Sequence, residues 1–178
     1  RGIGPTYADK INRVGLRFGD VVEVLGDEDW TNATVARMNA SLEAAGSSER
    51  VSADGLAGDI AWIHETYASC IANTGLMLDN ALKLGEHVIL EGAQGTLLDI
   101  DQGTFPFVTS SITSRGNATH GAGIHPGHVK DVIGITKAYI TRVGHGAMPT
   151  ELDDEAGEHM GTVGKEFGTT TGLSLIHI

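Results

Sequence analysis

The sequence is poor in several residue types, and each shortage excludes a class of protein. Among its 178 residues there is one cysteine, Cys70, which excludes an internal disulfide and a zinc site built from several cysteines. Only 12 Lys and Arg residues stand against 23 Asp and Glu residues, and the net charge is −11. Nucleic-acid binding depends on clustered cations, so we expect no nucleic-acid partner.

Long apolar runs are also missing. No stretch approaches the roughly 20 consecutive apolar residues that cross a bilayer, and no basic segment followed by an apolar one marks a secretory signal at the start, where Arg1 stands. A single cysteine is consistent with a reducing compartment. We therefore expect a soluble, cytoplasmic chain with no membrane partner.

Glycine, in contrast, is abundant, with 25 residues. Apolar residues at helical spacing predict helices over about 7–14, 32–45, 57–70 and 76–84, with Thr6 and Thr31 as N-caps of the first two. Two β-branched runs, over 87–90 and 132–143, are bounded by glycine and predict buried strands. The predicted class is α/β, with a mostly parallel central sheet and surrounding helices. Ligands of such sheets lie beyond the carboxyl ends of strands, so residues from 91 and from 143 onward are the candidates.

The first candidate segment follows the run 87–90. Gln94 lies on a loop between Gly92 and Gly95, where its amide can donate and accept hydrogen bonds to a planar base. Thr109 begins a run of three hydroxyl side chains whose N–H groups suit a phosphate. An ordinary glycine turn is the alternative interpretation of the first motif.

The second candidate segment follows the run 132–143. Arg142 offers a planar set of donors for phosphate or carboxylate, and a surface loop with a solvated arginine is the alternative. Near the end of the sequence, Thr169, Thr170 and Thr171 lie between two glycines. This segment is interpreted either as an anion-binding loop or as a linker. The spacing of His120, His125 and His128 is not that of a helix-borne ligand pair, so no metal site is expected.

These segments together, in their order and spacing, resemble the adenylosuccinate synthetase family. The matching motifs are Arg1-Gly2-Ile3-Gly4-Pro5-Thr6-Tyr7, Glu91-Gly92-Ala93-Gln94-Gly95-Thr96-Leu97-Leu98-Asp99-Ile100-Asp101, Val108-Thr109-Ser110-Ser111, Thr141-Arg142-Val143-Gly144 and Pro149-Thr150-Glu151. The resemblance covers residues 1–172 and implies a synthetase fold similar to that of P-loop NTPases, present here in part.

The resemblance implies a homodimeric ligase of purine (AMP) biosynthesis that joins IMP to L-aspartate and converts GTP to GDP and phosphate. In that family GTP phosphorylates the 6-oxygen of IMP, and the aspartate amine then displaces the phosphate. The family's phosphate loop, with its catalytic aspartate that also ligates Mg²⁺, and its catalytic histidine do not match any segment of this chain, and neither does its guanine-binding part. We therefore expect no catalytic residue and no metal ligand in this chain, which we interpret as an inactive fragment.

The resemblance also assigns binding residues. Gln94 matches the glutamine that reads the IMP base, and Thr109 the threonine that binds its phosphate. Arg13 matches an arginine that reaches the IMP of the partner subunit, with Arg17 close by. The other matches are to the IMP-site loop, at Val143 and Gly144, and to the aspartate-substrate loop, at Thr169, Thr170 and Thr171.

Residues 173–178, Leu-Ser-Leu-Ile-His-Ile, match nothing in the family and are interpreted as a non-native, adaptor-derived tail. Two alternative functions stay open. One is a complete, non-catalytic nucleotide-sensing module, and the other is a histidine-rich metal hydrolase that would use His120 or His125.

Overall fold

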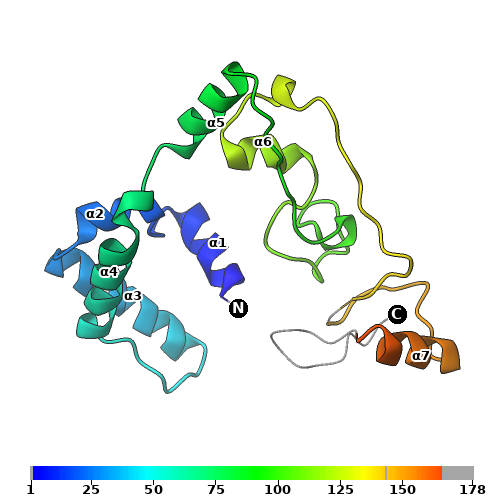
Figure 1. Ribbon diagram of the computed structural model, residues 1–178. Helices are drawn as coiled ribbons and strands as arrows, with labels where there is room; N and C mark the ends of the chain where they lie inside the picture. Colours follow the sequence, from blue (N-terminus) through cyan, green and yellow to red (C-terminus); the bar gives the residue numbers. More distant parts are fainter. Residues whose placement is uncertain (1, 143, 166–178) are drawn as a thin grey trace. The chain divides into compact units, whose positions relative to one another are not determined.

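The computed structural model describes residues 2–142 and 144–165 of the chain. The chain divides into two compact units, residues 1–74 and 75–178 (Figure 1). Each unit has its own helices and its own pocket, and each is described separately.

The first unit is helical. Its elements are α1 (Ile3–Asn12), η1 (Phe18–Asp20), α2 (Val21–Val24), α3 (Glu28–Ala44), α4 (Ala53–Tyr67) and η2 (Ala68–Cys70). Helix α4 packs against α2 and α3. The buried apolar side chains of this unit are Val21 and Ile60, among the residues described. The three long helices that the apolar spacing predicts in this part of the sequence are confirmed, and the short helix α2 was not predicted.

The helix starts differ from the prediction. Helix α3 begins after Asp27, whose carboxylate accepts the N–H of Trp30 at 2.9 Å. Helix α4 begins after Ser52, whose hydroxyl oxygen accepts the N–H of Gly55 at 3.1 Å. The predicted caps Thr6 and Thr31 are wrong, because both lie inside helices and donate to the carbonyl four residues earlier, at 2.8 and 2.7 Å. A cap must instead accept an N–H, and Asp27 and Ser52 do so.

Two polar contacts fix the loops of this unit. The side-chain amide of Asn39 on α3 donates to the carbonyl of Val51 at 2.9 Å and accepts the Val51 N–H at 2.8 Å. Arg37 on the same helix forms an ion pair with Asp9 of α1 at 2.9 Å. The second contact ties α1, which carries the candidate residue Arg13 at its C-terminal end, to α3.

The second unit contains more irregular backbone. Its elements are α5 (Thr74–Lys83), η3 (Thr96–Leu98), α6 (Gly116–Ala122), η4 (Pro126–His128) and α7 (Glu155–Val163). Helix α5 confirms the helix predicted over 76–84, whereas α6 and α7 were not predicted. Helix α7 is capped by Asp154, whose carboxylate accepts the N–H groups of Ala156 and Gly157, both at 3.0 Å.

The parallel sheet predicted from the runs 87–90 and 132–143 is not found. Within residues 2–142 and 144–165 no segment is a strand, so the predicted parallel sheet is not confirmed. A strand is stabilised by a hydrogen-bonded neighbour as well as by its own sequence. Neither run forms a strand among the described residues, and each contains an apolar side chain that is almost fully exposed, Ile89 at 90% and Ile135 at 95%.

Among the described helices, none is both long enough and apolar enough to span a membrane.

We predict that Asn39→Ala destabilises the chain more than Asn32→Ala does. Both residues lie on α3, so the change in helix propensity is the same, but Asn32 is exposed and Asn39 makes two hydrogen bonds to Val51. The expected difference in the free energy of unfolding is about 1–2 kcal/mol. Urea unfolding followed by circular dichroism measures it, and equal values for the two variants would contradict the role assigned to Asn39.

Candidate functional site

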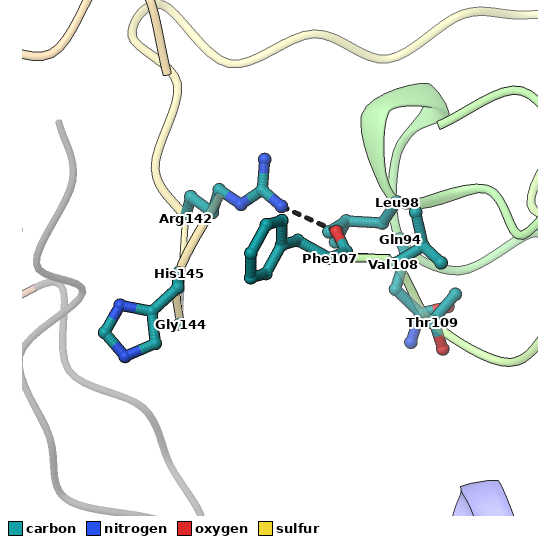
Figure 2. A pocket seen from close by; sticks show the side chains of 8 residues that line it. All are labelled: Gln94, Leu98, Phe107, Val108, Thr109, Arg142, Gly144 and His145. Atoms are coloured by element: carbon teal, nitrogen blue, oxygen red, sulfur yellow. Dashed lines mark hydrogen bonds between the residues drawn. The ribbon is translucent and has the colours of Figure 1, made fainter. Parts of the chain in front are cut away.

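The second unit contains a pocket of about 340 Å³. It brings together four residues that the sequence analysis singled out, Gln94, Thr109, Arg142 and Gly144 (Figure 2). The other residues that line it are Leu98, Phe107, Val108 and His145. Figure 2 shows Arg142 and His145 on one side of the view and Gln94 and Thr109 on the other, with Phe107 between them.

Gln94 occupies an uncommon backbone conformation. Its φ is 58°, in the left-handed region that non-glycine residues rarely adopt. The carbonyl oxygen of the next residue, Gly95, accepts two hydrogen bonds. The N–H of Leu98 donates to it at 2.9 Å, and the Thr113 hydroxyl donates to it at 3.0 Å. A strained residue held by its neighbours at the edge of a pocket is typical of a functional position.

Thr109 is held by the backbone on the far side of the same loop. Its N–H donates to the carbonyl of Leu98 at 2.9 Å, and the N–H of Ile100 donates to the carbonyl of Ser111 at 3.2 Å. These two bonds fix residues 109–111 against residues 98–100. The Thr109 side chain therefore has a defined place at the pocket without help from a sheet.

Asp99 lies beneath both segments and is completely buried. One carboxylate oxygen accepts the N–H groups of Asp101 and Gln102, both at 3.0 Å. The other accepts the N–H groups of Thr113, at 2.6 Å, and Ser114, at 3.1 Å, and lies 3.3 Å from the Thr113 hydroxyl. A buried carboxylate is stable only when its oxygens are satisfied in this way.

These hydrogen bonds lower the pKa of Asp99 to about 2, with the N–H groups of Gln102 and Asp101 contributing most. Burial acts in the opposite direction and is outweighed. Asp99 is therefore ionised at neutral pH. Its charge is balanced by backbone dipoles, and within residues 2–142 and 144–165 it forms no ion pair.

Arg142 supplies the positive charge of the pocket. Its side chain is 7% exposed and donates to two carbonyls, that of Phe107 at 2.6 Å and that of Ala147 at 3.0 Å (Figure 2). The Nε of Arg142 is buried and has no partner, and no carboxylate pairs with the guanidinium among the described residues. Neutral carbonyls leave its charge uncompensated, a state that favours an anionic ligand nearby.

The turn after Arg142 requires glycine at one position. Gly146 has a φ of 130°, and a Cβ there would overlap the Arg142 guanidinium and lie 2.8 Å from the Cβ of Phe107. The absent side chain lets the backbone pass directly over the guanidinium. The predicted residue Gly144, with a φ of 84°, begins the same turn and lines the pocket.

The first unit has a larger pocket, of about 730 Å³, around the predicted residue Arg13. Arg13 ends α1 in the left-handed conformation, with a φ of 63°, and its N–H donates to the carbonyl of Lys10 at 3.1 Å. Pocket-lining residues besides Arg13 are Thr6, Asp9, Lys10, Gly15, Leu16, Arg17 and Asp20.

The two arginines of this pocket differ in their partners. Arg17 donates two hydrogen bonds to Asp20, at 2.8 and 2.6 Å, which raises the pKa of Arg17 and lowers that of Asp20. The charge of Arg17 is thus paired within the chain. Arg13 forms no ion pair among the described residues, so its guanidinium is free to bind another group.

The three clustered histidines do not form a metal centre in the part of the chain that the structure describes. The rings of His125 and His128 lie 6.3 Å apart, edge to face, and the Nδ1 of His125 accepts the N–H of Gly127 at 3.0 Å. No three His, Cys, Asp or Glu side chains converge on one point within residues 2–142 and 144–165. The described residues therefore do not fit a magnesium or zinc site.

Four predicted site residues, Val143, Thr169, Thr170 and Thr171, lie outside the described residues.

Comparison with known proteins identifies the family. The family model described as adenylosuccinate synthetase matches residues 1–174. The chain belongs to the adenylosuccinate synthetase family. Synthetases of this name from Parafrankia sp. (strain EAN1pec) and Colwellia psychrerythraea are 47% and 48% identical over 172 residues, 97% of this chain. The fully ligated adenylosuccinate synthetase of Plasmodium falciparum has a similar structure, with a TM-score of 0.84 and 32% identity over 98% of this chain.

The match covers only part of these relatives. The chain spans 40% of the length of the Parafrankia and Colwellia synthetases, and the same share of the Plasmodium structure. The resemblance seen in the sequence motifs is confirmed at the level of the family.

Sequence reasoning did not single out Asp99 as a support of this candidate site. The available signal was an acidic residue inside the apolar stretch Leu97-Leu98-Asp99-Ile100. A buried acid needs donors, but the donors come from residues up to 15 positions away, so the pattern alone could not indicate them.

We predict that Asp99→Asn reduces the acid sensitivity of the fold. The pKa of Asp99 is lowered on folding, so the unfolded chain binds more protons at acid pH, and the stability from the carboxylate is lost as pH falls from about 4 towards 2. Between these values the free energy of unfolding should fall more steeply in the wild type than in the variant. Urea titrations at several pH values measure the slopes.

The matched control is Asp101→Asn. Asp101 is exposed, and its side chain makes none of the bonds to Asp99. The Asp101→Asn substitution removes one negative charge two residues away from Asp99. If Asp99→Asn has the slope of the wild type, the carboxylate does not have the stabilising role assigned to it.

Proposed function

We propose that this chain is the IMP-binding region of a GTP-dependent ligase that joins IMP to L-aspartate, giving adenylosuccinate, GDP and phosphate in purine biosynthesis. The observation that carries the proposal is the pocket of the second unit, where Gln94, Thr109 and Arg142 line one space in a chain of this family. An amide, a hydroxyl and an uncompensated guanidinium are the groups that a base and a phosphate need.

In the proposed complex each residue has a separate task. Gln94 donates to and accepts from the edge of the base, with its backbone already held in the left-handed conformation. Thr109 donates its hydroxyl to the phosphate, and Arg142 balances the negative charge. Val143 and Gly144 approach the nucleotide with their backbone.

The remaining substrates are assigned to other parts of the protein. Thr169, Thr170 and Thr171 begin the loop that binds aspartate, and Arg13 reaches the IMP of the partner subunit in a homodimer. Arg13 suits this task because it forms no ion pair within the described residues of the chain. GTP and the Mg²⁺ that accompanies it would be bound by groups outside the described residues. The described residues themselves do not gather as a metal site.

We further propose that residues 1–172 are a partial synthetase domain of a longer, cytoplasmic protein, and that residues 173–178 are non-native. The 40% coverage of the relatives supports the first part of this proposal, the partial domain. The groups that activate the 6-oxygen and stabilise the transferring phosphoryl group would then lie elsewhere in the complete enzyme.

We predict that the complete protein releases phosphate only when IMP, GTP and aspartate are all present, and that the 178-residue chain alone releases none above the blank. Assays of phosphate release and of adenylosuccinate formation test the complete protein and the 178-residue chain. If the complete protein binds IMP without turnover, the sensing module replaces the ligase. If activity instead requires zinc or manganese and disappears in His125→Ala, the hydrolase is supported.

We predict that Gln94→Gly in the complete enzyme raises the KM for IMP by about 10- to 100-fold, because a site that hydrogen-bonds the base loses that contact. Glycine adopts a φ of 58° without strain, so the backbone of the loop is kept and the loss reports on the amide. The KM values for GTP and aspartate are the internal controls. An unchanged KM for IMP would show that Gln94 does not contact the nucleotide.

A further inference from the structure

Gln94 can act on a ligand only if its strained loop stays in place, and the structure shows what keeps it there. No strand supports this loop among the described residues. Its carbonyl at Gly95 is tied to Thr113, 18 residues further along the chain, through the Thr113 hydroxyl at 3.0 Å. Thr113 does not line the pocket, and this bond connects its side chain to the Gln94 loop.

Thr113 is itself oriented by Asp99. The Thr113 N–H donates to the buried carboxylate at 2.6 Å, and its hydroxyl lies 3.3 Å from the same oxygen. The second carboxylate oxygen holds the N–H groups of Asp101 and Gln102, in the turn that ends the Gln94 loop. One carboxylate therefore fixes both the loop and the segment to which it is tied.

The backbone of Gly103 lies in close contact with the backbone of Asp99 and Leu97. The Gly103 N–H donates to the carbonyl of Asp99 at 2.8 Å, and a Cβ at Gly103 would overlap the carbonyls of Asp99 and Leu97. The turn around Asp99 leaves no room for a side chain at Gly103. Movement of the Asp99 carboxylate would be passed to the residues bound to it.

We propose that Asp99 and Thr113 are positioning residues, which set the place of the Gln94 amide in the pocket without touching the ligand. The proposal rests on the function proposed above, in which Gln94 reads the base of IMP. It assigns to Asp99 and Thr113 a task in nucleotide recognition, in addition to their contribution to stability.

The test uses Thr113→Val in the complete enzyme, because valine keeps the shape of threonine and replaces the hydroxyl with a methyl group, which forms no hydrogen bond. The KM for IMP should rise by about 5- to 10-fold, the loss expected when one supporting hydrogen bond disappears. The KM values for GTP and aspartate should stay within about twofold. Thr162→Val is the matched control, since Thr162 is exposed on α7 and does not line the pocket.

A double-mutant cycle separates positioning from general damage. If Thr113 acts through Gln94, then adding Thr113→Val to Gln94→Gly should change the KM for IMP by less than about twofold. Additive effects of the two substitutions would overturn the proposal, because a structural defect would act whether or not the amide is present.

Asp99→Asn provides a second, independent variant. Asparagine keeps the volume of the side chain, but one carboxylate oxygen becomes an NH₂ group, which cannot accept a hydrogen bond. The N–H groups that this oxygen accepted therefore lose their partner, and half of the backbone bonds are lost. Its effect on the KM for IMP should also disappear in the Gln94→Gly background. A wild-type enzyme without IMP-dependent activity would overturn the proposed function itself, whereas an active enzyme with additive cycles overturns only the positioning role.

Discussion

The candidate site depends on a buried negative charge that forms no ion pair with any of the residues the structure describes. Asp99 is stable in the interior because four backbone N–H groups point at its carboxylate. Water is excluded from this place, so removing any donor would leave charge unsatisfied. The carboxylate thereby imposes one geometry on residues 99–102 and 113–114, and the loops that carry Gln94 and Thr109 extend from that geometry.

The helices could be predicted from the sequence because their causes are local. Apolar residues three or four apart define each long helix, and each such helix formed within a few residues of the predicted range. Their starts were less predictable. Thr31 and Asp27 both suit a cap, and only the structure shows that the Thr31 hydroxyl donates inside the helix while Asp27 accepts the free N–H of Trp30.

The strands could not be predicted in the same way, because a strand depends on its neighbours. The runs that contain Ile89 and Ile135 have the composition of buried strands, yet both side chains are almost fully exposed. The composition of these segments indicates that they can form strands, but a strand forms only where another segment of chain lies beside it. Gln94 and Thr109 could be singled out as candidates because the motif itself carries their chemistry, and both line one pocket. The contacts of Asp99, in contrast, come in part from residues far along the chain.

The electrostatics of the pocket follow from these two kinds of contact. Asp99 is neutralised by amide dipoles beneath the loop, so its charge is largely balanced where it lies. Arg142 is held in place by the carbonyls of Phe107 and Ala147, which orient the guanidinium but cannot balance its charge. The backbone thus cancels the negative group and leaves the positive one. The pocket lined by Gln94, Thr109 and Arg142 therefore combines neutral hydrogen-bonding groups with a local positive charge, even in a chain whose net charge is −11, and this combination is what the proposed nucleotide ligand requires.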